Sequence, residues 1–85
     1  MVGGHTKDVL IGIDGAVVEI EEQVALASLP PAVRATIEKN AGKGKIKVVE
    51  SIMKNNSLFA YEAHIVSAGK TREIKVAPNG DLMTR

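Results

Sequence analysis

The sequence predicts an α+β domain in which one short helix packs on an antiparallel β-sheet, with its elements in the order ββαββββ. Three observations lead to this prediction. Several segments alternate apolar and polar side chains, as "FAYEAHIV" (residues 59–66) does. Asx-Gly turn signals, Asp14-Gly15 and Asn79-Gly80, each join two such segments. One stretch alone, residues 29–41, has apolar residues at helical spacing, and a helix lying across a sheet is the economical arrangement.

The first two strands are expected at residues 6–12 and 16–24. Branched side chains are frequent from Thr6 to Ile11, and "AVVEIEEQV" resumes the strand pattern after the Asp14-Gly15 turn. Two strand segments around an Asp-Gly pair predict a β-hairpin.

The predicted helix follows Leu29. Pro31 suits its first turn, where the missing N–H has no partner to lose, and Gly42 is placed to end it. Leu29, Val33, Ile37 and Ala41 recur on one face. A helix of about three turns is not stable alone in water, so this face needs a sheet to lie on.

The four remaining strands are expected in residues 45–85 as an antiparallel meander, because strands that follow one another in sequence usually lie side by side. Glu50 breaks the alternation that begins at Ile46, which predicts a bulge or the end of regular pairing near it. The side chains expected to face the helix are Ile46, Val48, Phe59, Tyr61, Ile65, Ile74, Val76 and Leu82.

The opposite face of the sheet is expected to be open, with apolar side chains between charged ones such as Glu62 and His64. Exposed apolar patches often mark a partner or self-association surface, although scattered surface aliphatics are also normal. The residues proposed for this face are Leu10, Val18, Ile20, Val49, Val66 and Met83.

The composition excludes several classes of function. With 85 residues, 45% of them hydrophobic, the chain (residues 1–85) has the size of one small domain. A net charge of +1 with a single Tyr and a single Phe argues against a nucleic-acid partner. The absence of cysteine excludes disulfides and thiol nucleophiles, and no apolar run is long enough for a membrane span.

No catalytic, cofactor-binding or metal-binding residues are predicted. Neither His5 nor His64 has acidic residues nearby at metal-ligand spacing, and the serines lack the context of a nucleophile. A metal or proton-transfer role for His64 is the minor alternative to a solvated strand residue. Two charged groups are interpreted as solvated surface: the acidic Glu19, Glu21 and Glu22, and the basic Lys39, Lys43, Lys45 and Lys47.

The chain repeats itself. "GHTKDVLIGIDG" (residues 4–15) aligns without a gap to "GKTREIKVAPNG" (residues 69–80). In this alignment Val9 meets Ile74 and Ile11 meets Val76, so Val9, Ile11 and Val17 are expected to face the core in the same way as Ile74, Val76 and Leu82. Convergence of two hairpins on similar turns is the alternative explanation.

The unit that ends in "GKTREIKVAPNGDL" resembles the PepSY-like family, whose members are also described as β-lactamase-inhibitor-like. The residues that carry the resemblance are Leu29-Pro30, Val33, Ile37, "AGKGKI", Tyr61-Glu62 and the final hairpin. The resemblance covers about residues 25–85 as a complete unit. Because members often occur in tandem, it implies that residues 1–24 are either the tail of a preceding unit or a hairpin that completes this sheet.

The resemblance implies a non-catalytic, exported protein-binding module, periplasmic or secreted, and it suggests proteases and other hydrolases as partners. The inhibitory loop of inhibitor-like members has no matching motif here. The alternative function is structural, a self-assembling domain that acts as a homodimer or through tandem repeats. Neither a cofactor nor a nucleic-acid partner is expected.

Overall fold

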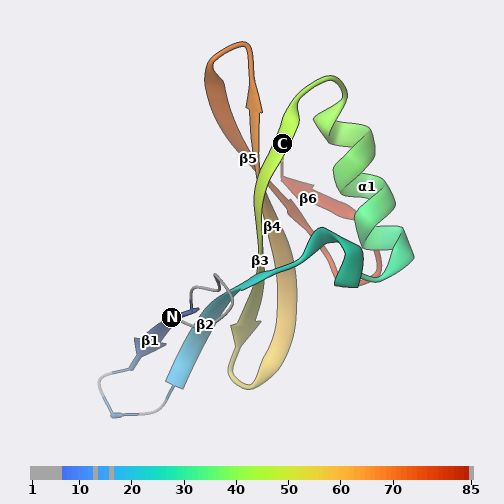
Figure 1. The fold of residues 1–85 in the computed structure, drawn as a ribbon. Coiled ribbons are helices and arrows are strands. Elements are labelled where there is room, and N and C mark those ends of the chain that lie inside the picture. The colour runs from blue at the N-terminus through green and yellow to red at the C-terminus, as the bar shows by residue number, and fades with distance from the viewer. Residues whose placement is uncertain (1–6, 13, 16, 85) are drawn as a thin grey trace.

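The structure is a computed structural model that describes residues 7–12, 14–15 and 17–84 (Figure 1). It confirms the α+β class and the order of the main elements, with one 3-10 turn, η1, added before the helix. Six strands form a single antiparallel sheet in the order β1-β2-β3-β4-β5-β6. The elements are β1 (Lys7–Ile11), β2 (Val17–Val24), η1 (Leu26–Ser28), α1 (Pro31–Ala41), β3 (Lys45–Lys54), β4 (Ser57–Ser67), β5 (Lys70–Val76) and β6 (Leu82–Thr84).

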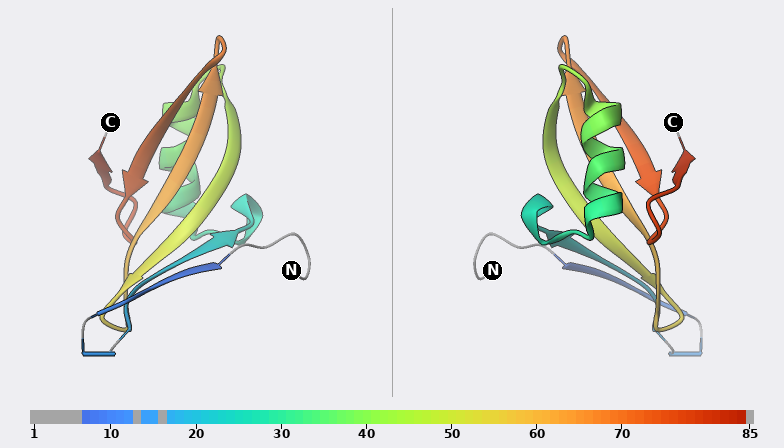
Figure 2. Two further views of the ribbon diagram at one scale, coloured as in Figure 1. Left: turned by 90° about the vertical axis from the view of Figure 1, so that its left-hand side faces the viewer. Right: turned by 90° about the vertical axis from the view of Figure 1, so that its right-hand side faces the viewer.

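Helix α1 begins at Pro31 and ends at Ala41, followed by Gly42 at φ +55°, in agreement with the sequence signals. It packs mainly on β3, β4 and β5, and Figure 2 shows it on one face of the sheet. Burial of this face supplies the stability that so short a helix lacks by itself. The core residues are Leu29, Val33, Ile37, Ala41, Val49, Ala63, Ile65, Ile74 and Val76.

A bulge in β3 decides which side chains face the helix. Ile46 pairs with Ile65 and Val48 pairs with His64, so Lys47 is the extra residue. This irregularity lies close to Glu50, as the sequence predicted. Because it falls before Val48, Val48 and Val49 lie on the opposite faces from those expected. Val49 is buried in the core under α1, and Val48 shares the opposite face with His64. The expected placement of both valines was wrong for this reason.

A second bulge lies in β4, where Ile52 pairs with Ala60 and Met53 pairs with Leu58. Phe59 is the extra residue and does not belong to the core cluster, contrary to expectation. Its ring centroid instead lies 4.0 Å from Nζ of Lys54.

The apolar side chains of β1 are not buried in the core. Val9 and Ile11 are exposed, and so is Leu82 at the opposite edge of the sheet. Helix α1 runs roughly along the strands (Figure 2) and is about 10–12 Å across, whereas neighbouring strands are about 4.8 Å apart, so it covers β3, β4 and β5 and leaves β1 uncovered. Figure 1 shows β1 and the start of β2 extending beyond α1. The side chain of Val17 lies outside the described part of the chain.

Candidate functional site

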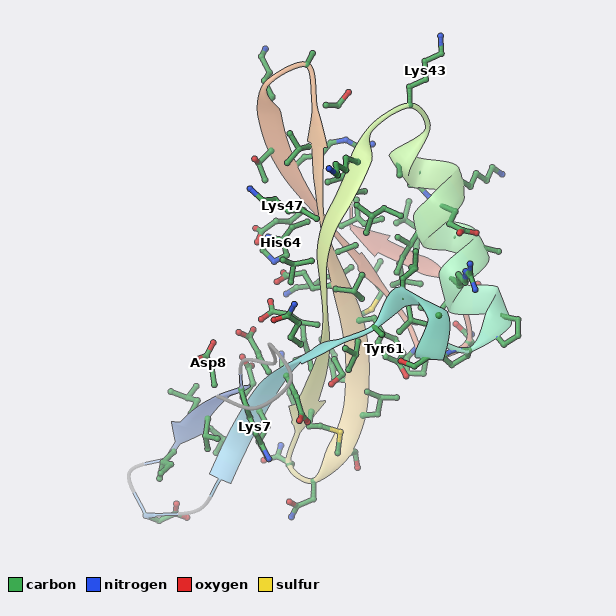
Figure 3. All side chains as sticks on the ribbon, viewed as in Figure 1. Lys7, Asp8, Lys43, Lys47, Tyr61 and His64 are labelled. Atoms are coloured by element: carbon green, nitrogen blue, oxygen red, sulfur yellow. The ribbon has the colours of Figure 1, made fainter. Side chains whose placement is uncertain are left out.

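Figure 2 shows that α1 lies on one face of the sheet, and no described helix covers the other face. Charged side chains gather on this second face. We call this surface the open face. Figure 3 shows His64 on this side and Tyr61 on the side of α1. The alternation of β4 predicted this separation, and the structure confirms that Glu62 and His64 share the open face. Five strands, β1 to β5, contribute the residues that define it: Asp8, Glu21, Glu50, Glu62, His64 and Glu73.

His64 lies at the centre of three carboxylates. Its Nε2 is 3.3 Å from Oε1 of Glu50 and 3.4 Å from Oε1 of Glu62. Its Nδ1 is 3.3 Å from Oε2 of Glu73. Glu50 comes from β3 and Glu73 from β5, the two strands on either side of His64. The imidazole therefore has a carboxylate at each ring nitrogen, which fixes the orientation of the ring.

A second acidic group adjoins the first through Glu50. Carboxylate oxygens of Asp8, Glu21 and Glu50 lie within 4.8 Å of one another. Partial burial raises the pKa of Glu21, and repulsion from nearby carboxylates raises it further, which shows that negative charge is concentrated here. The carboxylates concerned are Glu50, Glu19, Glu62 and Asp8.

The residues that could hold a cation are Glu50, Glu62 and His64, whose donor atoms also lie within 4.8 Å of one another. Sequence spacing gave no sign of this group, because Glu50 comes from a different strand. Glu50 joins the group because it pairs with Glu62 across β3 and β4, and this pairing depends on the bulge at Lys47. The cluster also places hydrogen-bond acceptors and negative charge on the open face.

The six apolar residues proposed for the open face do not form one patch. Leu10 lies there opposite Glu19, and Val66 lies there between Lys45 and Thr71. Val49 is in the core, as described above. The other three lie elsewhere: Val18 in the bulged part of β2, Ile20 on the side of α1, and Met83 exposed on the edge strand β6.

Ile20 belongs instead to a row of apolar residues that crosses four strands. Val9 pairs with Ile20, Ile20 with Met53, and Met53 with Leu58. The row lies on the same side of the sheet as α1 but beyond the part that α1 covers, since Val24, four residues further along β2 and on the same face, packs against the core. Val9 and Leu58 at its two ends are exposed. Only the register of three strand pairs reveals this row.

A shallow hollow of about 230 Å³ lies where β2 separates from β3. It is smaller than a usual drug-sized ligand site. Its lining is Gln23, Val24, Ala25, Leu26 and residues 46–49 of β3.

Comparison with known proteins shows the fold. No protein-family model matches this chain, and no curated protein does. Among solved structures, the chain is similar to the crystal structure of a BLIP-like protein from Bacteroides fragilis, with 20% sequence identity and a TM-score of 0.78. The match covers 98% of this chain and 60% of that one. The BLIP-like fold implied by the sequence resemblance is therefore confirmed. Within the described residues, no helix has the length and apolar character needed to cross a membrane.

Proposed function

We propose that this chain is a non-catalytic protein-binding module that contacts its partner through the open face of the sheet. The observation that carries the proposal is the set of carboxylates held around His64 on a face that no described helix covers. Such a face is complementary to a partner surface rich in lysine and arginine. A non-catalytic role is further supported by the sequence, in which neither the serines nor the histidines stand in a catalytic motif.

Hydrolases, proteases in particular, are the proposed partners. Two likenesses support this choice: the sequence resemblance to the PepSY-like family, and the fold shared with a protein described as BLIP-like. Export to the periplasm or outside the cell is proposed on the same sequence resemblance. Cell fractionation of the native organism with an antibody against the chain would test it.

The binding experiment uses purified hydrolases and the intact chain in calorimetric titrations. The double variant Glu50→Gln, Glu62→Gln removes two charges while keeping the size of both side chains. It is expected to weaken binding by about tenfold or more, equal to about 1.4 kcal/mol. Glu38→Gln is the matched control, because Glu38 is an exposed carboxylate on α1, away from the open face.

Equal affinities for the double variant and the native chain would exclude the open face as the binding surface. Failure of every hydrolase to form a stoichiometric complex would overturn the choice of partner class. A raised salt concentration should weaken the complex, because dissolved ions screen the proposed attraction between the two charged surfaces.

Self-assembly is the second candidate function. It is favoured by one observation, the exposed aliphatic residues of the edge strand β1.

A further inference from the structure

The two hairpins that align in sequence also have the same strand register. Ile11 pairs with Val17 and, at the aligned positions, Val76 pairs with Leu82. Leu10 pairs with Glu19, and Lys75 pairs with Thr84. Both ladders shift at the same place, between Leu10 and Ile11 and between Lys75 and Val76. The aligned turn glycines, Gly15 and Gly80, have φ of +87° and +99°.

The surroundings of the two hairpins differ. Ile74 and Val76 are 1% and 0% exposed, whereas the aligned Val9 and Ile11 are 47% and 60% exposed. Strand β5 has β4 along its second edge and α1 over its face. Strand β1 has β2 on one edge and, within the described residues, no strand on the other. The first hairpin thus has the same register as the buried one, but no described strand or helix covers β1 as β4 and α1 cover β5.

The edge of β1 that no described strand pairs with is protected by charge only at its beginning, where Lys7 and Asp8 lie. Natural edge strands are kept short or carry proline or charged residues. Strand β6, the other edge, is three residues long. Strand β1 is five residues long, and its last three, Val9, Leu10 and Ile11, are consecutive exposed aliphatics that point to both faces.

We propose that β1 of one chain pairs antiparallel with β1 of a second copy, about a two-fold axis that passes between the two Leu10 residues. In this register Leu10 lies opposite Leu10 of the other copy, and Val9 lies opposite Ile11. All three aliphatics of each copy then contact aliphatics, and the two sheets form one continuous sheet. A two-fold axis is the commonest way in which soluble proteins form dimers.

Charge selects this register over its neighbours. A two-fold axis at Asp8 would place two aspartates opposite each other, which destabilises a strand pair. An axis at Val9 would place Asp8 opposite Leu10 and Lys7 opposite Ile11. An axis at Ile11 would place Asp8 opposite Asp14, again two aspartates facing each other. The axis at Leu10 avoids this, because it places Asp8 opposite Gly12. A net charge of +1 per chain does not oppose the association of two copies.

The second copy is preferred to a head-to-tail contact between β1 and β6. Strand β6 has two apolar residues, Leu82 and Met83, so a β1–β6 contact would give only two of the three aliphatics of β1 an apolar partner. The dimer involves the edge of the sheet and not its open face, so it stands independently of the proposed binding function. The carboxamide variants described above should leave dimerisation unchanged, and this keeps the two tests separate.

The test uses the intact chain, in which a single introduced cysteine is the only thiol. Directly opposite residues of antiparallel strands have Cα atoms about 4.5–5.5 Å apart, within the range of a disulfide. Leu10→Cys is therefore expected to give a disulfide-linked dimer under mild oxidation. Met83→Cys is the matched control, because Met83 is 42% exposed on the other edge strand, against 58% for Leu10.

Light scattering from micromolar to millimolar concentration should show the native mass rising to twice the chain mass. Leu10→Lys should abolish this rise, because two lysines would then face each other across the axis. Its fold should be retained, since Glu19 lies opposite within the same chain. Circular dichroism checks the fold, and Met83→Lys should still dimerise.

A native chain that stays monomeric at every concentration would overturn the proposal, even if Leu10→Cys forms some cross-linked product. Efficient cross-linking of Met83→Cys, or a mixed disulfide between the two cysteine variants, would instead place β6 in the interface and overturn it. A dimer that persists unchanged in Leu10→Lys would do the same.

Discussion

The hydroxyl of Thr36 on α1 donates a hydrogen bond to the carbonyl oxygen of Gly80, 2.5 Å away, and so joins the helix to the turn between β5 and β6. A second link lies at the C-terminal end of the helix, where the guanidinium of Arg72 donates to the carbonyl oxygen of Asn40. The helix is therefore fixed to the last hairpin by polar contacts as well as by the core.

The close approach of the turn to α1 makes Gly80 harder to replace than Gly15. A Cβ added at Gly80 would lie 2.8 Å from Cβ of Ala32, whereas one added at Gly15 would meet nothing within 4 Å. Both glycines have positive φ, which costs an alanine about 1–2 kcal/mol. Gly80→Ala should therefore lower the free energy of unfolding by clearly more than Gly15→Ala. Urea denaturation of the two variants measures the difference, and equal losses would show that the helix contact is unimportant.

Substitution of two isoleucines, Ile37 and Ile11, compares a buried position under α1 with an exposed position on β1. Ile37→Ala removes a fully buried side chain from the helix and should cost about 2–5 kcal/mol. Ile11→Ala removes the same atoms from an exposed position on β1 and should change stability by no more than about 0.5 kcal/mol in the monomer. Thermal unfolding at low concentration compares them. A large loss for Ile11→Ala would mean that β1 is buried in solution.

The raised pKa of Glu21 predicts how stability depends on pH at the open face. A carboxyl with a higher pKa in the folded state binds its proton more tightly there, so its ionisation destabilises the fold. This destabilisation is absent well below the ordinary value of 4.5 and complete above the raised folded pKa.

Glu21→Gln should consequently raise the melting temperature at pH 7, by up to about 4 °C. The gain should shrink as the pH is lowered through the folded pKa towards 4.5 and vanish below it. Melting curves at several pH values check this. A gain that stays constant with pH would assign the effect to packing instead of charge.

Truncation tests whether residues 1–24 belong to this domain. Because Val9 and Ile11 are exposed, removal of residues 1–12 should leave the melting temperature of the monomer nearly unchanged. Removal of residues 1–24 also takes away β2, exposes the edge of β3 and removes Val24 from its contact with the core. This shorter chain should unfold at a lower temperature or aggregate. An unchanged midpoint would identify the whole hairpin as dispensable for residues 25–85.

Periodicity in the sequence predicted the elements and half of the site. Alternation along β4 was enough to place Glu62 and His64 on one face, since both belong to the same regular stretch. It could not place Glu50 beside them, because one extra residue at Lys47 reverses the alternation and nothing local indicates where the extra residue falls. The exposure of Val9 and Ile11 was missed for another reason. An alternating strand shows which side chains share a face, but not whether another element covers that face.

The order of the strands in the sheet is the order of the strands in the sequence, and this bears on how the chain folds. Four of the five strand pairs close across a short turn, and β2 and β3 alone are joined through residues 25–44, which include α1. Little chain entropy is therefore lost before the first contacts form. Such local pairing favours fast folding for a protein rich in β-structure. The links from Thr36 to Gly80 and from Arg72 to Asn40 join residues 44 and 32 positions apart, and they can form only after the hairpin of β5 and β6 meets the helix. Docking of α1 onto the last hairpin is thus expected to be the slowest step of folding.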